Sequence, residues 1–345
     1  MKSKKVRGFF DQEYRLEKIA IKDPLEILST KVNWEQFRKK IEKAYENIDY
    51  SQGGRPPYDR LMMFKILILQ EYYGLSDDQI EFQLLDRLSF QKFIGQGLHD
   101  TVPDAKTIWL YRQTLTEART LDELFVYLKR QLEGYGLIAK KGVMVDASFA
   151  HVPVQRNTPD ENDQLKNDET PDWSENKMRQ KDTDANWTKK GGQSHYGYKQ
   201  HIKADVESKI VTNFEVTSAS EHDSQLLNNL LESSDQGQSL YGDSAYMSEK
   251  IIAELADKGI KQKILAKGYR NTELTKKERE RNQRLSSKRC RVEHIFGWIK
   301  QKSGRLIRGI GIKRVTARIT LRLFIYNLSR ATFLIKDRKR GLTII

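Results

Sequence analysis

The chain has 345 residues, 38% of them hydrophobic and 31% charged, with a formal net charge of +14 and one cysteine, Cys290. This composition excludes a chain that is disordered throughout, and one cysteine excludes an internal disulfide and a cysteine-based zinc site. No apolar run approaches the roughly 20 residues that span a bilayer, and no apolar stretch follows the basic N-terminus, so we expect a cytoplasmic protein without a membrane partner.

Two helical segments are predicted before residue 137. Residues 1–54 are polar, with one amphipathic stretch at 34–48, and end in a turn-forming Gly-Gly-Arg-Pro-Pro sequence. Residues 55–136 show apolar residues at helical spacing and two helix starts, a capping box at Ser76 and an Asp104 cap. Several short helices in series are typical of a helix-turn-helix-like DNA-binding region, but they equally suit a helical oligomerisation or packing region.

From Gly142 the sequence pattern changes to short β-branched and period-two runs that alternate with helical patterns. Strands are predicted at 143–145, 196–204, 210–216, around 241 and at 262–265, and helices at 224–232, 248–258, 275–302 and 316–335. Residues 155–190 are rich in Asn, Asp, Glu, Gln and Lys and are predicted to be an inserted loop. This half of the chain is therefore predicted to be an α/β domain, after a mainly helical N-terminal region.

The positive charge is concentrated in the last part of the chain. Residues 284–345 contain 17 Lys and Arg against two acidic residues, Glu293 and Asp337. A localised basic segment attracts polyanions, so we favour a nucleic-acid partner over a solubility surface, and a purely structural nucleic-acid binder stays open at this point. Four residues of this segment are candidate DNA contacts: Arg305, Arg308, Lys313 and Arg314.

Three carboxylates are candidates for metal-assisted chemistry. Asp146 ends a β-branched run, Asp243 follows the strand predicted around residue 241, and Glu293 lies on the predicted basic helix. Carboxylate oxygens hold Mg²⁺ or Mn²⁺, and two such ions can assist phosphoryl transfer. Taken singly, an Asp after a strand is more often a turn or cap residue.

The predicted basic helix places two cations beside Glu293. At 100° per residue, Arg289, Lys300 and Ser286 lie within about 40° of Glu293 on one helix face. Such a face suits a metal ligand between two phosphate-binding cations, and from spacing alone it suits a surface row of salt bridges equally well. Another candidate nucleic-acid contact is His195 to Lys199, where His195, Tyr198 and Lys199 interleave basic and aromatic side chains, although sheet packing explains the same pattern.

Several short motifs of the chain together resemble a known family. The chain is similar to the insertion-sequence transposases of the IS five group and its IS four relatives over about residues 54–330. The motifs are Val145-Asp146-Ala147-Ser148, residues 182–199 (DTDANWTKKGGQSHYGYK), Tyr241-Gly242-Asp243-Ser244-Ala245-Tyr246, Val292-Glu293-His294-Ile295-Phe296-Gly297, Arg308-Gly309-Ile310-Gly311 and Leu328-Ser329-Arg330.

The resemblance implies a ribonuclease H-like DDE catalytic domain over residues 137–345. It implies that Asp146, Asp243 and Glu293 are the catalytic metal ligands for Mg²⁺ or Mn²⁺, two ions per site. Arg289 and Lys300 match the Arg and Lys of the family's signature, whereas Ser286 stands where the signature has Tyr. The implied partners are transposon terminal inverted repeats and target DNA, bound by a homodimer in the nucleoid of a bacterium or archaeon. The alternatives are a nuclease of the same fold that never joins DNA, and a DNA-binding regulator derived from a transposase.

Overall fold

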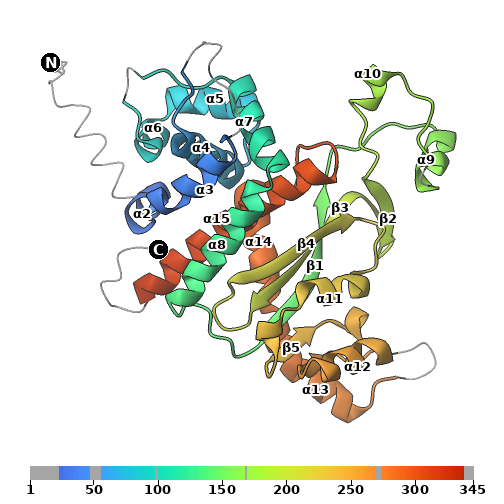
Figure 1. The fold of residues 1–345 in the computed structure, drawn as a ribbon. Helices are drawn as coiled ribbons and strands as arrows, with labels where there is room; N and C mark the ends of the chain where they lie inside the picture. The colour runs from blue at the N-terminus through green and yellow to red at the C-terminus, as the bar shows by residue number, and fades with distance from the viewer. Residues whose placement is uncertain (1–22, 47–55, 98–99, 168, 269–272, 338–345) are drawn as a thin grey trace, which may run out of the picture. The chain divides into compact units, whose positions relative to one another are not determined.

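The structure is a computed structural model that describes residues 23–46, 56–97, 100–167, 169–268 and 273–337. These residues form two compact units (Figure 1). The first unit contains the described residues up to Leu124 and those from Ala331 onward, and the second unit is Phe125–Arg330. Within the described ranges, no helix is both long enough and apolar enough to cross a membrane.

The first unit is built of helices around the almost wholly buried helix α4 (Arg60–Tyr73). Phe64 of α4 packs against the rings of Trp34 and Phe37, and Phe93 adds an edge-on contact to Trp34. The predicted capping box of Ser76 is confirmed, and Asp104 caps its helix as predicted. The other elements are α2 (Pro24–Lys31), η1 (Trp34–Phe37), α3 (Arg38–Lys43), α5 (Asp77–Asp86), α6 (Leu88–Ile94), α7 (Ala105–Glu117) and the start of α8 (Thr120–Gly134).

The second unit contains a six-stranded mixed sheet, with strand order β2-β3-β1-β5-β6 and β4 paired to β3. Strands β1 to β4 are antiparallel to their neighbours in that group, whereas β5 runs parallel to β1 and β6 runs parallel to β5. The chain therefore has the mixed α/β architecture that the alternating pattern predicts. The strands are β1 (Val143–His151), β2 (Asn186–Lys190), β3 (Gln193–Asp205), β4 (Val211–Ser218), β5 (Ser239–Gly242) and β6 (Lys261–Ile264).

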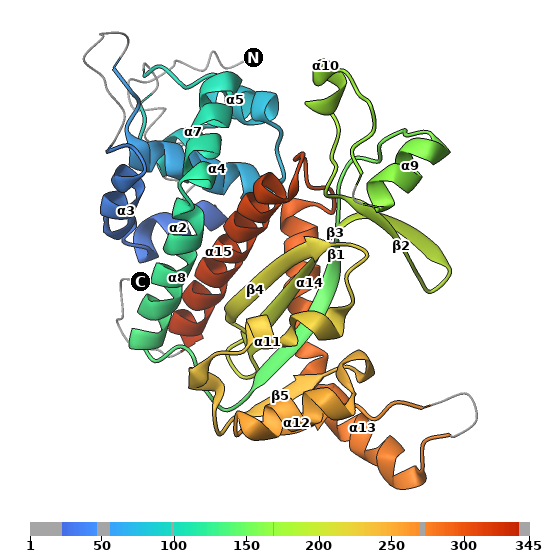
Figure 2. The same cartoon turned by 45° about the vertical axis from the view of Figure 1, so that its right-hand side comes forward.

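Strand β3 is the longest strand and pairs with three others, which requires a close backbone approach at one residue. Gly197 has φ +130°, and a Cβ atom there would lie 2.6 Å from the carbonyl oxygen of Ala150. A side chain at this position would push β1 and β3 apart. The strand continues from β2 through a tight turn at Gly191-Gly192, and the resulting hairpin extends beyond the rest of the sheet (Figures 1 and 2).

Short helices cover one face of the sheet, and the C-terminal helices lie against β1 and β5. Val143 and Val145 of β1 pack against α11 (Leu227–Leu230) and α12 (Glu249–Asp257) in one hydrophobic core. Helix α13 (Lys276–Arg289) contacts β1 and β5, and helix α14 (Arg291–Ser303) contacts β1. The next helix in the chain is α15 (Ile312–Asp337). The remaining short turns are η2 (Asp223–Leu226), η3 (Ser233–Asp235) and η4 (Ser244–Tyr246).

The prediction of one helix over residues 275–302 is wrong. The helix is interrupted at Cys290, whose amide donates to the Ser286 carbonyl oxygen while its own carbonyl oxygen accepts from the Glu293 amide. The apolar positions of α14 begin at Val292 and are buried, whereas α13 has no buried residue. Both helices contact the sheet, but only α14 buries apolar side chains.

The prediction of an inserted loop over 155–190 is wrong in part, because the insertion contains regular elements. The segment contains α9 (Pro159–Lys166), α10 (Glu175–Met178) and strand β2. Trp173 is buried, and its indole N–H donates to the Glu161 carboxylate at 2.6 Å. One aromatic residue with a polar handle is thus enough to organise a small polar insertion.

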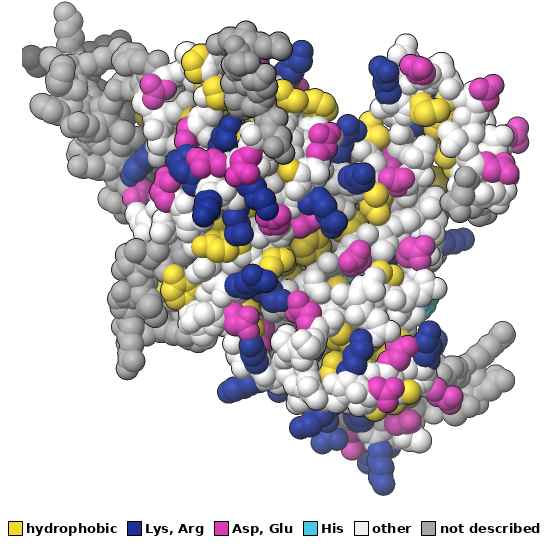
Figure 3. All heavy atoms as spheres, in the orientation of Figure 1, with side chains coloured by type: hydrophobic (Ala, Val, Ile, Leu, Met, Phe, Trp, Pro, Cys, Tyr) yellow, Lys and Arg dark blue, Asp and Glu magenta, His cyan; other side chains and the backbone are white. Residues whose placement is uncertain are grey.

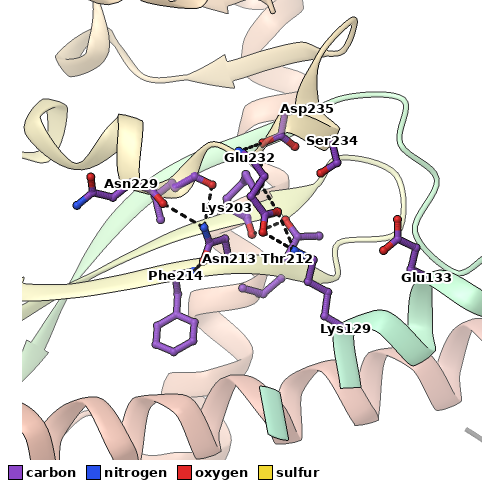
Figure 4. A network of polar contacts seen from close by, with 12 residues as sticks. Lys129, Glu133, Lys203, Thr212, Asn213, Phe214, Asn229, Glu232, Ser234 and Asp235 are labelled. Carbon is purple, nitrogen blue, oxygen red and sulfur yellow. Dashed lines mark hydrogen bonds and ion pairs between the residues drawn. The ribbon is translucent and has the colours of Figure 1, made fainter. Parts of the chain in front are cut away.

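Four charged side chains from α8, β3 and the segment around η3 form a network (Figure 4). The ammonium group of Lys203 is fully buried and lies 2.9 Å from Glu232 and 2.6 Å from Asp235. Lys129 of α8 donates to both oxygens of Glu232, at 2.6 and 2.7 Å. Burial favours a higher pKa for Glu232, but the hydrogen bonds from the two lysines outweigh it and lower the pKa below its usual value. The network is charge-balanced, with two cations and two carboxylates.

Candidate active site

Two of the predicted carboxylates lie on adjacent strands of the sheet. Val143 and Met144 of β1 pair in parallel with Leu240 and Tyr241 of β5, and continuing this register places Asp146 beside Asp243. Asp243 directly follows β5, and its carboxylate accepts from the Ala245 amide at 2.8 Å. Asp146 accepts from the Ala147 amide at 2.8 Å. These hydrogen bonds orient the two carboxylates where the short strand β5 ends beside the middle of β1.

The charge of Asp243 acts on the pKa of Asp146. Burial, with a smaller contribution from the negative charge of Asp243, raises the pKa of Asp146 to about 6, against the lowering effects of the Ala147 amide, Arg289 and Lys190. A carboxylate pair that repels itself in a half-buried position is stabilised by any cation between or beside its members. The carboxylate pair therefore favours binding of a cation.

Glu293 reaches this pair through Arg289. One guanidinium nitrogen of Arg289 lies 3.5 Å from the Asp146 carboxylate, and the other donates to Glu293 at 2.7 Å. Arg289 ends α13 and Glu293 lies in the first turn of α14, so the break at Cys290 separates the two partners. The Glu293 side chain is otherwise 58% exposed. The structure thus brings the three carboxylates and Arg289 to one region of the second unit.

The donor set suits a hard divalent cation in part. Asp146 and Asp243 offer adjacent carboxylate oxygens, which are the ligands that Mg²⁺ and Mn²⁺ prefer. Among the described residues, however, no three His, Cys, Asp or Glu side chains are arranged to hold one metal ion together. At this site the Arg289 guanidinium binds Glu293 and reaches Asp146.

Lys300 of α14 acts electrostatically on Asp146, whereas Ser286 lies three residues before Arg289 on α13. Lys300 is half-buried on α14, and burial and the charge of Arg305 lower its pKa while Asp146 raises it. Ser286 lies on α13 and is half-buried. Arg305, Arg308, Lys313 and Arg314 are exposed between α14 and the first turn of α15.

The three candidates on strand β3 differ in their surroundings. Tyr198 is fully buried, and its hydroxyl donates to Asp182 at 2.5 Å, so its side chain supports the sheet and is not exposed to contact DNA. Lys199 donates to the Glu221 carbonyl oxygen and lies 3.0 Å from Asp223. His195 is partly exposed and stacks on Phe149.

Two neighbouring aspartates of the motif over residues 182–199 cap loops and helices. Asp182 accepts from the amides of Asp184 and Ala185 and so caps this turn. Asp184 accepts from the Ile312 amide at 2.8 Å and so caps the first turn of α15. The motif therefore joins the end of the insertion to the C-terminal helix.

Sequence reasoning missed Asp223. Its carboxylate lies 3.0 Å from Lys199 and 4.0 Å from Lys190 and, with Asp146 and Asp243, raises the pKa of the buried Tyr246 hydroxyl after burial itself. Asp223 follows β4 by a few residues, so the rule that strand ends gather polar site residues gives a signal for it.

Comparison with known proteins adds two sequence matches and one structural likeness. A family model described as a transposase DDE domain matches residues 139–328, and a model described as a transposase domain matches residues 13–114. A cryo-EM structure of the piggyBac transposase synaptic complex with hairpin DNA is similar to 93% of this chain and 74% of that chain, with a TM-score of 0.44 and 10% sequence identity. The first family match covers more than half of the chain and contains Asp146, Asp243 and Glu293.

Proposed function

Because the chain belongs to the transposase DDE domain family, we propose that it is the DNA transposase of an insertion sequence of the IS five group. It binds the terminal inverted repeats as a homodimer and catalyses DNA cleavage and strand transfer in a ribonuclease H-like catalytic domain, residues 137–345. Residues 1–54 and 55–136 form the region that binds DNA or pairs the subunits; of this region, the structure describes residues 23–46, 56–97 and 100–136. The observation that carries this proposal is the placement of Asp146 and Asp243 side by side, with Glu293 held opposite by Arg289.

The residues of the site divide into two roles. Asp146, Asp243 and Glu293 would hold Mg²⁺ or Mn²⁺, with Glu293 exchanging its Arg289 partner for the ion. Two bound ions would activate the attacking oxygen and stabilise the leaving oxygen. Arg289, once released from Glu293, and Lys300 hold phosphates of the scissile strand by charge-assisted hydrogen bonds.

Both reactions are displacements at phosphorus. Water first attacks the phosphodiester at the transposon end, which forms a P–O bond to water, breaks the bond to the 3′ oxygen and leaves a free 3′-OH. That hydroxyl then attacks a target phosphodiester, forming a new 3′-O–P bond while the bond from that phosphorus to the target's 3′ oxygen breaks, and the displaced target end leaves as a 3′-OH. One bond forms for each that breaks, so joining needs no energy cofactor.

The test supplies the chain with its own ends, identified by sequencing the inverted repeats that flank its gene. A labelled uncut end and a pre-cut end with target plasmid should give a 3′-OH product and a strand-transfer product in Mg²⁺ or Mn²⁺, whereas Ca²⁺ should allow binding only. Cleavage without joining would favour the nuclease alternative. Binding without either reaction would favour the regulator.

The first prediction concerns the two cations at the carboxylates. Arg289→Ala and Lys300→Ala should each lower the salt slope of DNA binding by about 1, and cleavage should fall further than binding, because a phosphate misplaced by about 1 Å loses on the order of 100-fold in rate. Ser286→Ala removes one hydroxyl hydrogen bond and should cost only about 0.5–1.5 kcal/mol. Filter binding and single-turnover cleavage on the same labelled end measure both effects. Wild-type cleavage by both cation variants would remove them from the site.

The second prediction concerns the exposed basic residues after α14. The surface over α12 and α13 mixes blue and magenta side chains (Figure 3), whereas Arg305, Arg308, Lys313 and Arg314 lie together in sequence with no acidic residue among them. Neutralising these four to Gln should flatten the log–log salt dependence by about 0.9 for each lost phosphate contact.

A matched control removes the same charge elsewhere on the second unit. Lys250, Lys258, Lys261 and Lys263 are exposed lysines of α12, its C-terminal end and β6. Changing these four to Gln should leave the slope nearly unchanged. Equal slopes for the two quadruple variants would show that net charge, and not the segment after α14, drives binding.

A further inference from the structure

The turn between β3 and β4 holds a lysine in a backbone conformation that favours glycine. Lys209 has φ +60°, and its amide donates to the Asp205 carbonyl oxygen at 2.9 Å. A side chain in this left-handed region costs free energy that glycine would avoid. Two other described residues besides glycines have positive φ, Arg119 and Lys140, and each pairs with a nearby carboxylate. The Lys209 ammonium group instead donates to Nδ1 of His294, at 2.9 Å.

Three basic side chains from the C-terminal helices converge on the same turn. Arg291 of α14 and Arg330 of α15 each donate to a carbonyl oxygen of the turn, at 2.9 and 2.6 Å. His294 of α14 is exposed, and because its Nδ1 accepts from Lys209, its Nε2 carries the ring proton and is a further donor. Lys209, Arg291, His294 and Arg330 are called the Lys209 cluster.

The Lys209 cluster carries an excess of positive charge. Burial lowers the pKa of Lys209, and the positive charges of Arg330 and Arg291 lower it further, so the three cations act on one another. Glu207 lies 3.2 Å from Arg291 and balances one of these charges. Because like charges held together repel, an anion bound among them is stabilised by every member of the cluster. The cluster therefore suits an anion with several acceptor oxygens.

The Lys209 cluster is separate from the carboxylates of the candidate active site. On α14, at 100° per residue, Arg291 lies about 160° around the helix axis from Glu293. The turn follows Asp205, which pairs with Val143, and Val143 precedes Asp146 by three residues, or about 10 Å along β1. A DNA duplex covers such a distance in about three base pairs. DNA held at the carboxylates therefore has other phosphates within reach of the cluster.

We propose that the Lys209 cluster binds one backbone phosphate of duplex DNA outside the cleavage site, so that the bound duplex extends past the N-terminal end of α14. An ammonium group, two guanidinium groups and an imidazole N–H offer donors to the phosphate oxygens. Contacts to phosphates position DNA without reading its bases, so the contribution of the cluster should be independent of sequence. The inference rests on the proposed DNA transposase function and adds an anchor point to it.

The test uses the full chain with a duplex of the terminal inverted repeat and a series of the same duplex, each with one neutral methylphosphonate at a successive position. Lys209→Gly removes the ammonium group and suits the positive φ, so its urea denaturation midpoint should be no lower than that of the wild type. It should weaken binding of the unmodified duplex by about 5-fold and lower the salt slope by about 0.9. One methylphosphonate position should weaken wild-type binding equally and should have no further effect on Lys209→Gly.

The matched control is Lys140→Gly, which removes a lysine of the same left-handed conformation that pairs with Glu133. It should leave the affinity, the salt slope and the methylphosphonate profile unchanged, and Lys209→Arg, which keeps the charge, should bind like the wild type. Unchanged affinity in Lys209→Gly, or a loss that adds to that of every methylphosphonate, would overturn the inference while the proposed function stands.

Inorganic phosphate separates a DNA phosphate from a free anion. If it raises the melting temperature of the wild type but not of Lys209→Gly, and no DNA position is coupled to Lys209, the cluster is a small-anion site and the inference is wrong. Failure of the wild-type chain to bind the duplex would overturn the proposed function itself.

Discussion

Asp146→Asn, Asp243→Asn and Glu293→Gln are each expected to reduce DNA cleavage and joining by more than about 100-fold while leaving end binding within a few-fold. The change is nearly isosteric, so it removes a negative charge without a change of packing. Each amide keeps one acceptor oxygen, which preserves the backbone hydrogen bonds that Asp146 and Asp243 accept. What is lost is the charge that binds a divalent cation.

The measurement pairs single-turnover cleavage of a labelled transposon end with a binding assay on the same DNA. Asp257→Asn is the matched control, because Asp257 is an exposed carboxylate at the end of α12 and should leave both readings unchanged. A variant that still cleaves at more than about a hundredth of the wild-type rate would remove that residue from the triad. A parallel collapse of binding would show a structural role instead.

The second large effect is expected at the buried charge network. Lys203→Met should lower the free energy of unfolding by about 3–5 kcal/mol, because it leaves the carboxylate of Asp235, which is only 4% exposed, without its cation. Glu232 is less affected, since it is 35% exposed and keeps Lys129. The methionine fills a similar volume, so the loss reports charge and not a cavity.

Chemical denaturation of the full chain measures this effect. Adding Asp235→Asn to Lys203→Met should recover most of the loss, because it removes the unpaired charge and retains an acceptor for the Glu232 amide. Lys250→Met is the control on an exposed pair, 86% exposed and 3.9 Å from Glu254, and should change stability by less than about 0.5 kcal/mol. A loss for Lys203→Met no larger than that of the control would show that the network contributes no net stability.

Local signals in the sequence predicted much of this fold. The helix starts at Ser76 and Asp104 rest on side chains that bond backbone amides two or three residues away, so a short window contains all the information. Asp146 and Asp243 were found because each follows a short apolar run, and strand ends are where α/β sheets expose polar groups. Their adjacency depends only on parallel pairing of β1 with β5.

Other features depend on contacts between distant segments, which no local pattern carries. Alternation along β3 predicts that Tyr198 and Lys199 point to opposite faces, but not which face is covered, so the burial of Tyr198 could not be read. Lys203 is a polar residue in a buried position, and its partners Glu232 and Asp235 lie in a later segment. The break at Cys290 contains no glycine or proline that would predict it. Only the packed structure shows it, because α14 buries apolar residues and α13 does not.

The pairing of β1 also affects how the chain folds while it is being synthesised. Val143 of β1 pairs with Asp205 on one side and with Leu240 on the other. Strand β1 can therefore complete its pairing only after the ribosome has synthesised these later segments. Non-local pairing of this kind is slow, because the chain loses loop entropy before the contacts form. Glu293 is later still, so a nascent chain holds two carboxylates without the third until α14 has emerged. If the proposed function holds, a nascent chain would acquire the complete carboxylate set only after almost all of the second unit has been synthesised.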